Sequence, residues 1–251
     1  MPDLPSRRRS PTSKSRGGQP SWTRPLTDRL TPAIKALVIA DAVLFAFYIF
    51  VREVRGPFME HLALGPGFLG GQLWQPVTSL FVHFDVLGFI FNLIGLWFVG
   101  AFIERTTGTR KFLQLFLGAG IFANIAIATV AHFSTYRAGA VFDGASYAVL
   151  ALFVAFGRMY GRSPTQVLGG LFIQARYLAL ILVAWSVIAD LMRADWPGLA
   201  GSLTATAAGY FISGGRIREI VQFLRARTRS TTRRYRVIDG GQAPKRPTYW
   251  N

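Results

Sequence analysis

The sequence contains no cysteine and three histidines among its 251 residues. The lack of cysteine excludes disulfides, a thiolate nucleophile and any metal site built on thiolates. His61, His83 and His132 are too scattered to indicate a metal cluster, and no histidine follows position 132. Acidic residues are also scarce, 12 against 28 Lys and Arg, which leaves a formal net charge of +16. We expect no metal and no other cofactor.

Apolar residues make up 51% of the chain, and they gather in long blocks. Such blocks predict membrane-spanning helices. The fold class is therefore predicted to be all-α, a polytopic membrane protein with six transmembrane helices. The fourth and sixth are short for a bilayer of roughly 30 Å, which suits helices packed in the centre of a bundle. The six segments are 32–51, 86–103, 112–131, 144–157, 177–192 and 198–213.

The basic residues are concentrated in two tails, seven before the first span and ten after Gly215. An even number of spans places both tails on one side, and the excess of Lys and Arg makes that side the cytoplasm. We predict three parts of the chain. Residues 1–31 form a disordered basic tail, residues 32–215 a transmembrane domain, and residues 216–251 a basic cytoplasmic tail.

The loops support this orientation. Those around 105–111 and 158–176 are basic, whereas the others, which hold residues such as Glu60, Asp85 and Asp190, are neutral or slightly acidic. Because topology explains most of the net charge, nucleic acid is not an expected partner. We expect the basic tails to attract anionic lipid.

Polar residues interrupt the second predicted span and its approach, "LWQPVTSLFVHFDVLGFIFNLIGLWFVGAFIERTTGTRKFL". An asparagine inside an apolar helix costs free energy unless it is hydrogen-bonded, so Asn92 must face the bundle or a water-filled cavity. An interhelical hydrogen bond and a role in chemistry both account for it. Glu104, at the cytoplasmic exit of this span, is expected to be a helix cap or a partner of Arg105. A later span begins with Gly144, Ala145 and Ser146.

The order and spacing of these residues resemble the rhomboid family of intramembrane serine proteases. The resemblance covers about residues 72–215 and the leading span. It implies six core helices and cleavage of transmembrane segments in other proteins without a cofactor, with Ser146 in the nucleophile position and Asn92 in the oxyanion position. It also implies an integral, multi-pass protein of a bacterial inner membrane with both termini in the cytoplasm.

A serine nucleophile needs a base within hydrogen-bond reach to take its proton. In rhomboids this base is a histidine on the sixth helix, followed by two residues, a small residue, three residues and a glycine. In the matching stretch "SLTATAAG", the glycine is Gly209 and the small residue is Ala205, so Ser202 stands in place of the histidine. The resemblance therefore predicts that the family's base is absent.

Other positions depart from the family pattern in the same way. Gly88 lies four residues before Asn92, where many rhomboids carry a second histidine. Tyr147 replaces a usual glycine, and Leu150 replaces a tyrosine that commonly stacks on the catalytic histidine. These changes are expected where the catalytic pair is no longer used.

Few other residues offer a replacement base. The four lysines are predicted at or near the cytoplasmic face, the wrong end for Ser146. His83 matches a structural histidine of the family, and Asp143 is expected to cap the fourth helix. A rearranged pair of Ser146 and His132 remains an alternative.

Two functions are consistent with these residues. The first is a catalytically impaired pseudoprotease that binds transmembrane segments of client proteins between the second and fifth helices. The alternative is an active intramembrane serine endopeptidase that uses Ser146 with a nonstandard base. Small residues also give Ser146 and Ser202 a packing role, because Gly201, Ala205 and Gly209 form a narrow face on the sixth span. The fourth span offers a partner face of small residues, namely Gly144, Ala148, Ala151 and Ala155. We see no intramembrane charge pair of the kind that transporters use.

Overall fold

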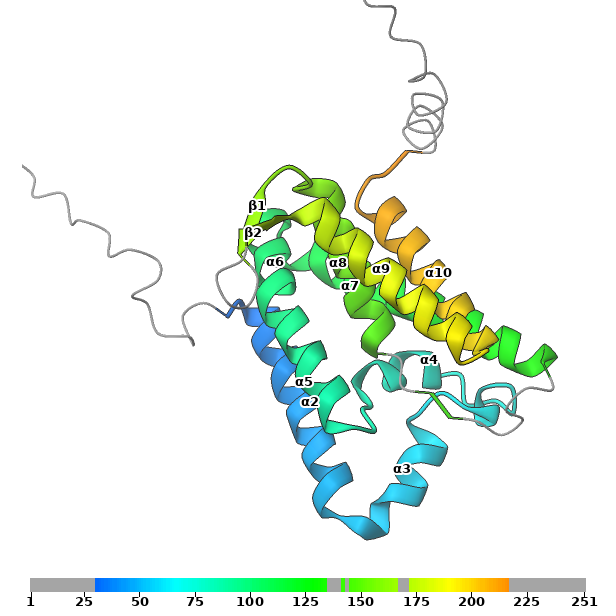
Figure 1. The fold of residues 1–251 in the computed structure, drawn as a ribbon. Coiled ribbons are helices and arrows are strands. Elements are labelled where there is room, and N and C mark those ends of the chain that lie inside the picture. The colour runs from blue at the N-terminus through cyan, green and yellow to red at the C-terminus, as the bar shows by residue number, and fades with distance from the viewer. Residues whose placement is uncertain (1–29, 135–140, 143–144, 167–171, 217–251) are drawn as a thin grey trace, which may run out of the picture. The chain divides into compact units, whose positions relative to one another are not determined.

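The structure is a computed structural model that describes residues 30–134, 141–142, 145–166 and 172–216. It contains six long helical segments, one for each predicted span (Figure 1). The all-α membrane fold is thereby confirmed. The chain divides into two compact units, Met1–Ser213 and Gly214–Asn251, and the helices described below all belong to the first.

The helical segments follow the predicted boundaries within a few residues. Their bounds are α2 Pro32–Phe50, α5 Val86–Gly95 continued by η5 Leu96–Gly100 and α6 Ala101–Thr107, α7 Thr109–Phe133, α8 Ala145–Met159, α9 Ala175–Met192 and α10 Trp196–Ile212. The η5 segment is a single stretch of π-helix that interrupts the second span.

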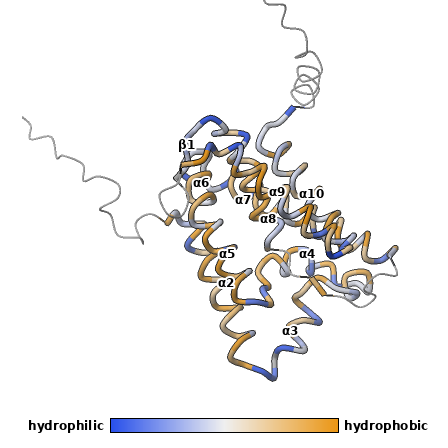
Figure 2. The backbone as a smooth tube through the Cα atoms, viewed as in Figure 1, coloured by the Kyte–Doolittle hydropathy of each residue, from blue (hydrophilic) through white to orange (hydrophobic). Residues whose placement is uncertain are grey.

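Four segments in the described part of the chain are long and apolar enough to cross a membrane: α2, the run from α5 to α6, α7 and α9. Figure 2 shows hydrophobic residues along these helices and hydrophilic residues at their connections. Helices α8 and α10 are shorter, with 15 and 17 residues, as predicted for the fourth and sixth spans.

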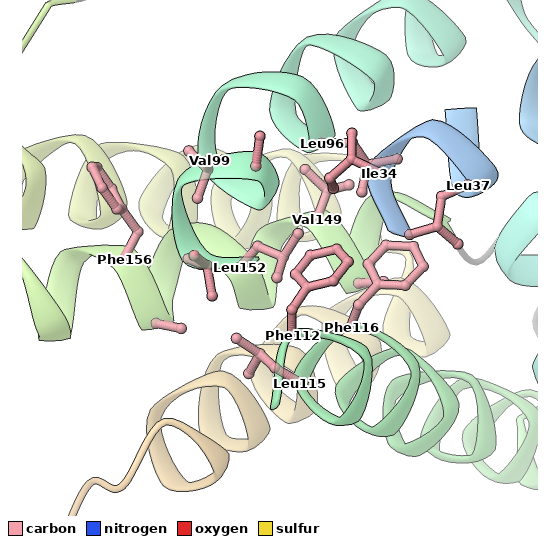
Figure 3. Close-up of a cluster of buried hydrophobic side chains, with 14 of the residues drawn as sticks. Ile34, Leu37, Leu96, Val99, Phe112, Leu115, Phe116, Val149, Leu152 and Phe156 are labelled. Atoms are coloured by element: carbon pink, nitrogen blue, oxygen red, sulfur yellow. The ribbon is translucent and has the colours of Figure 1, made fainter. Parts of the chain in front are cut away.

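Helix α8 is the centre of the bundle, because it packs against α7, α9, α10 and the second span. Its alanines and large apolar residues are buried along most of its length. Figure 3 shows part of the largest apolar cluster, in which Val149 and Leu152 of α8 lie together with Leu96 of η5, Phe112 of α7 and Ile34 of α2. A short central helix that is covered by others needs no full bilayer thickness of its own.

The connections contain further short elements. Between α2 and α5 lie η2 Arg52–Val54, α3 Arg55–His61, η3 Pro66–Phe68, α4 Gln75–Thr78 and η4 Ser79–Phe81. Between α8 and α9, where only a basic loop is predicted, β1 Pro164–Gln166 pairs antiparallel with β2 Phe172–Gln174. A turn at Gly108, with φ of 87°, joins α6 to α7, and a positive φ of this kind favours glycine.

Glu104 holds the start of the first span against the end of the second. Its buried carboxylate accepts the backbone N–H groups of Ala33 and Ile34, both at 3.2 Å, in the first turn of α2. It also accepts the hydroxyls of Thr31 and, at 2.6 Å, of Thr109 at the start of α7. The N–H groups of Ala33 and Ile34 lie in the first turn of α2, where a helix provides no intrahelical partner for them. Glu104 is therefore a helix cap, which is one of its two predicted roles.

Helices α8 and α10 approach until their backbones nearly touch. A Cβ atom added at Gly209 would lie 2.6 Å from the carbonyl oxygen of Ala151 and 2.9 Å from its Cα. The predicted packing of small residues between the fourth and sixth spans is confirmed at this point. At Gly201 an added Cβ would instead meet Ile127 of α7 and the ring of Tyr147.

We therefore expect Gly209→Ala to destabilise the bundle by about 1–3 kcal/mol, because α10 must move away from the backbone of α8. Gly118→Ala is the matched control, since its added Cβ would meet only Ile212 Cδ1, at an ordinary 3.5 Å. The midpoint of thermal unfolding is measured for both variants in detergent micelles. Equal midpoints for the two variants would contradict the close approach.

Candidate active-site region

The nucleophile position, Ser146, is the second residue of α8, and it is exposed. Just before it, the chain forms an isolated β-bridge to the loop between α2 and α5. Leu64 N–H donates to the carbonyl of Phe142 at 3.1 Å, and Phe142 N–H donates back at 2.8 Å. This bridge ties the end of the bundle that carries Ser146 to that loop. Asp143, the predicted cap, and Gly144 lie outside the described residues.

Asn92, in the predicted oxyanion position, lies next to Ser146. Its Nδ2 donates to Ser146 Oγ at 3.4 Å, a long and therefore weak hydrogen bond between α5 and α8. Asn92 itself is 5% exposed. Two residues 54 positions apart in sequence are thus brought together, and both predicted uses of Asn92, structural and chemical, are compatible with this contact.

Gly88 lies one helical turn before Asn92, in the position of the second histidine. Its N–H donates to Asp85 Oδ1 at 2.6 Å, which caps the start of α5. A Cβ at Gly88 would approach Asp85 Oδ2 to 2.8 Å. Any larger side chain here, histidine included, requires the capping carboxylate to move.

Ser202, in the position predicted for the family's histidine, is fully buried and belongs to a polar cluster between α9 and α10. Its hydroxyl donates to Asp190 Oδ2 at 2.5 Å and lies 2.7 Å from Ser186 Oγ. A serine hydroxyl has one proton. Because Ser202 gives that proton to Asp190, it must accept from Ser186, so the cluster runs from Ser186 through Ser202 to the carboxylate.

The residues that replace the family's glycine and tyrosine fill the space around this cluster with apolar contacts. Tyr147 packs against Leu64, Ile127 and Ala128, and its ring lies close to Gly201. Leu150 packs with Ala205 and with alanines of α7 and α8. Both side chains therefore face α10 near Ser202, where the family would place groups that serve a histidine.

The remaining histidines do not contact Ser146 through any hydrogen bond found among the described residues. His132 is exposed in the last turn of α7, where its ring meets Phe133 edge-on. His83 is buried between the rings of Phe45 and Phe89, and burial lowers its pKa to about 4. A neutral, buried imidazole is consistent with the structural role predicted for His83.

Several polar residues of the interior are not among the predicted site residues, and three of them lie within α2 and α9. Asp190 is expected among the loop charges, but it lies inside α9 and is 8% exposed. Asp41 lies inside α2 and is 2% exposed, and Ser186 belongs to the cluster described above. The sequence does carry a signal for the two carboxylates, because an acidic residue within a predicted span is rare and costly. Their neighbours on other helices are not predictable from spacing.

Helix α9 stands apart from the second span. It packs against α8 and α10, whereas within the described chain neither α5 nor α6 packs extensively against it. Large apolar side chains of α9, such as Leu180, Ile181 and Trp185, are exposed. Within the described chain, the second and fifth spans therefore share no extensive packing interface. No three His, Asp or Glu side chains gather into a possible metal site in the part of the chain that the structure describes.

Several known proteins are similar in sequence to this region of the chain. The chain is 31% identical over 136 residues to a rhomboid protease GlpG homolog of Cronobacter sakazakii, covering 54% of this chain and 43% of the relative. It is 33% identical over 108 residues to the mitochondrial RHOMBOID-like protein 12 of Arabidopsis thaliana, covering 42% and 31%. It is 29% identical over 93 residues to the rhomboid protease GluP of Bacillus subtilis, covering 37% and 18%.

The chain thus spans less than half the length of these curated relatives. A family model for the Rhomboid domain matches residues 70–215, which is more than half of the chain and includes α5 to α10. The matched region contains Gly88, Asn92, Ser146 and Ser202. The protein therefore belongs to the rhomboid family of integral membrane proteins.

Proposed function

We propose that this rhomboid is a catalytically impaired pseudoprotease that binds transmembrane segments of client proteins. The observation that carries the proposal is the hydrogen bonding of Ser202. A base for Ser146 must be free to accept its proton, whereas Ser202 is buried, donates to Asp190 and has Ser186 as its second partner. A neutral hydroxyl is in any case too weak a base for this purpose, because the pKa of its protonated form lies far below neutrality.

The lack of an extensive packing contact between the second span and α9 supports the binding function, because a client helix can pack between them. A client helix that enters there meets the exposed apolar side chains of α9 and reaches the end of α8 that carries Ser146. Helices associate in lipid through close packing and interhelical hydrogen bonds, and both remain available without a base. Binding of a client can therefore persist where cleavage does not.

The alternative is an active intramembrane serine endopeptidase. It is favoured by the contact between Asn92 Nδ2 and Ser146 Oγ, which keeps an amide donor beside the nucleophile position. One such donor in an oxyanion hole is worth about 3 kcal/mol of transition-state stabilisation. This enzyme would need a base other than Ser202, and His132 near the end of α7 is the candidate within the described chain.

We further propose that both termini lie in the cytoplasm of a bacterial cell and that the protein resides in the inner membrane. Support comes from the arginines and lysines that gather at one end of the bundle, near the α6–α7 turn and the α8–α9 connection. The basic tails would then face the anionic lipids of the cytoplasmic leaflet.

Reaction with an active-site probe separates the two functions. We expect the full-length protein in liposomes to show no labelling by a fluorophosphonate beyond that of Ser146→Ala, and no cleavage of a transmembrane substrate, because Ser146 lacks a base. His132→Ala tests the alternative base directly. Labelling that disappears in both Ser146→Ala and His132→Ala would establish the endopeptidase instead.

Restoring the histidine is expected to leave the site inactive. Ser202→His removes the Ser202 hydroxyl that bonds to Asp190 and Ser186, and it inserts a larger ring at a fully buried position. Gly88, Tyr147 and Leu150 are unchanged in this variant. We expect cleavage to remain at background and stability to fall. Ser202→Ala, which only loses the hydrogen bonds, should cost about 1–3 kcal/mol of unfolding free energy. Robust cleavage by Ser202→His would show that the rest of the catalytic site is intact.

Client binding can be measured without any chemistry. A photo-crosslinking amino acid at Trp185, exposed on α9, should capture a transmembrane client peptide in liposomes. The same group at Phe122, exposed on α7, is the control for random contact in the membrane. We expect capture at Trp185 to exceed capture at Phe122 several-fold and to be unaffected by Ser146→Ala. Equal capture at both positions would contradict a client site beside α9.

A further inference from the structure

A groove lies beside the C-terminal end of α8, whereas Ser146 lies at the N-terminal end of that helix. It has a volume of about 300 Å³ and opens between the second span, the end of α8 and β1. Four aromatic residues line one part of it, and Ser163, Pro164 and Thr165 line the other. Its volume is at the lower limit for ligand pockets, enough for a segment of an amphiphile but not for a whole helix.

The aromatic part of the groove is formed by rings that pack edge-to-face. The ring of Phe102 meets those of Phe156 and Tyr160 edge-on, with centroids 5.4 Å and 4.7 Å away. Phe156 is buried, whereas Phe98 and Phe102 are 46% and 42% exposed on a membrane-crossing segment. The rings therefore offer an apolar surface that is open to the hydrocarbon of the bilayer.

Two arginines are close in sequence to residues that line the groove, although neither lines it. Arg105 follows Phe102 by three residues in α6, so the two side chains lie on the same face of the helix. Arg162 directly precedes Ser163 in the chain. Both arginines are exposed. The groove thus combines aromatic rings on a membrane-crossing segment with hydroxyl-bearing residues, and an exposed arginine neighbours each of these two parts in sequence.

We propose that this groove binds an anionic phospholipid. The phosphate lies between Arg105, Arg162 and the hydroxyl of Ser163, and an acyl chain lies along Phe98 and Phe102. Guanidinium groups bind phosphate oxygens in a bidentate manner, and basic pockets between membrane helices bind acidic headgroups. This site is distinct from the nucleophile region, whereas Phe98 and Phe102 belong to the second span, which also borders the proposed client site.

Charge argues against a client segment as the occupant. Lys and Arg flank transmembrane helices on the cytoplasmic side, and this end of the bundle is the basic one. A client of the same orientation would bring like charge to Arg105 and Arg162. An anionic headgroup brings the opposite charge.

Native mass spectrometry of the full-length protein in micelles tests the proposal. Phosphatidylglycerol should bind more tightly than phosphatidylcholine, and Arg105→Gln with Arg162→Gln should weaken phosphatidylglycerol binding by about tenfold or more, since each basic residue near the headgroup contributes. Arg52→Gln with Arg110→Gln removes the same charge from exposed sites elsewhere and should change binding little. Phe98→Ala should weaken binding of both lipids. Thermal unfolding confirms that each variant is folded.

Four outcomes would overturn the proposal. Equal binding of the two phospholipids, or equal effects of the two double variants, would mean that the arginines select no headgroup. Displacement of phosphatidylglycerol by millimolar inorganic phosphate would identify a site for free phosphate. Displacement by a transmembrane peptide whose own binding is lost in Arg105→Gln with Arg162→Gln would assign the groove to clients. Persistence of phosphatidylglycerol against both competitors supports the lipid site.

Discussion

The structure depends on one constraint: a polar group inside the bilayer must find its partner within the protein, because no water is there to replace it. The backbone meets this constraint through its helices. Several side chains meet it through contacts between helices, as in the cap that Glu104 provides for α2 and the cluster of Asp190, Ser202 and Ser186 between α9 and α10. Asn124 does the same in α7, where its amide donates to Ser79 Oγ and to the carbonyl of Pro76.

These polar contacts act together with close packing around α8. Small residues let α10 approach α8 at Gly209, and this approach fixes the distance between the end of α8 that carries Ser146 and the face of α10 that carries Ser202. The loop between α2 and α5 is held from the other side by the bridge of Leu64 to Phe142. The position of Ser146 is therefore set by the scaffold and does not require a catalytic partner.

Much of this fold could be predicted, because hydropathy reports directly on the bilayer. The six helices, the short fourth and sixth spans and the pairing of small residues between them all follow from local composition. The proximity of Asn92 and Ser146 follows from the family resemblance. The hairpin β1–β2, the π-helical segment η5 and the cluster around Asp190 could not be predicted, since each depends on how distant segments meet. Asp41 is absent from the predicted site residues although its position within an apolar run marks it.

A serine at the predicted position of the family's histidine is compatible with a stable rhomboid scaffold because it satisfies two demands at once. It is small enough for a fully buried place on α10, and its hydroxyl joins Asp190 to Ser186. An apolar residue there would leave the carboxylate without this donor inside the membrane, at a cost typical of a buried unsatisfied group. Under the proposed function, Ser202 is thus retained for the junction of α9 with α10, and α9 in turn forms one wall of the proposed client site.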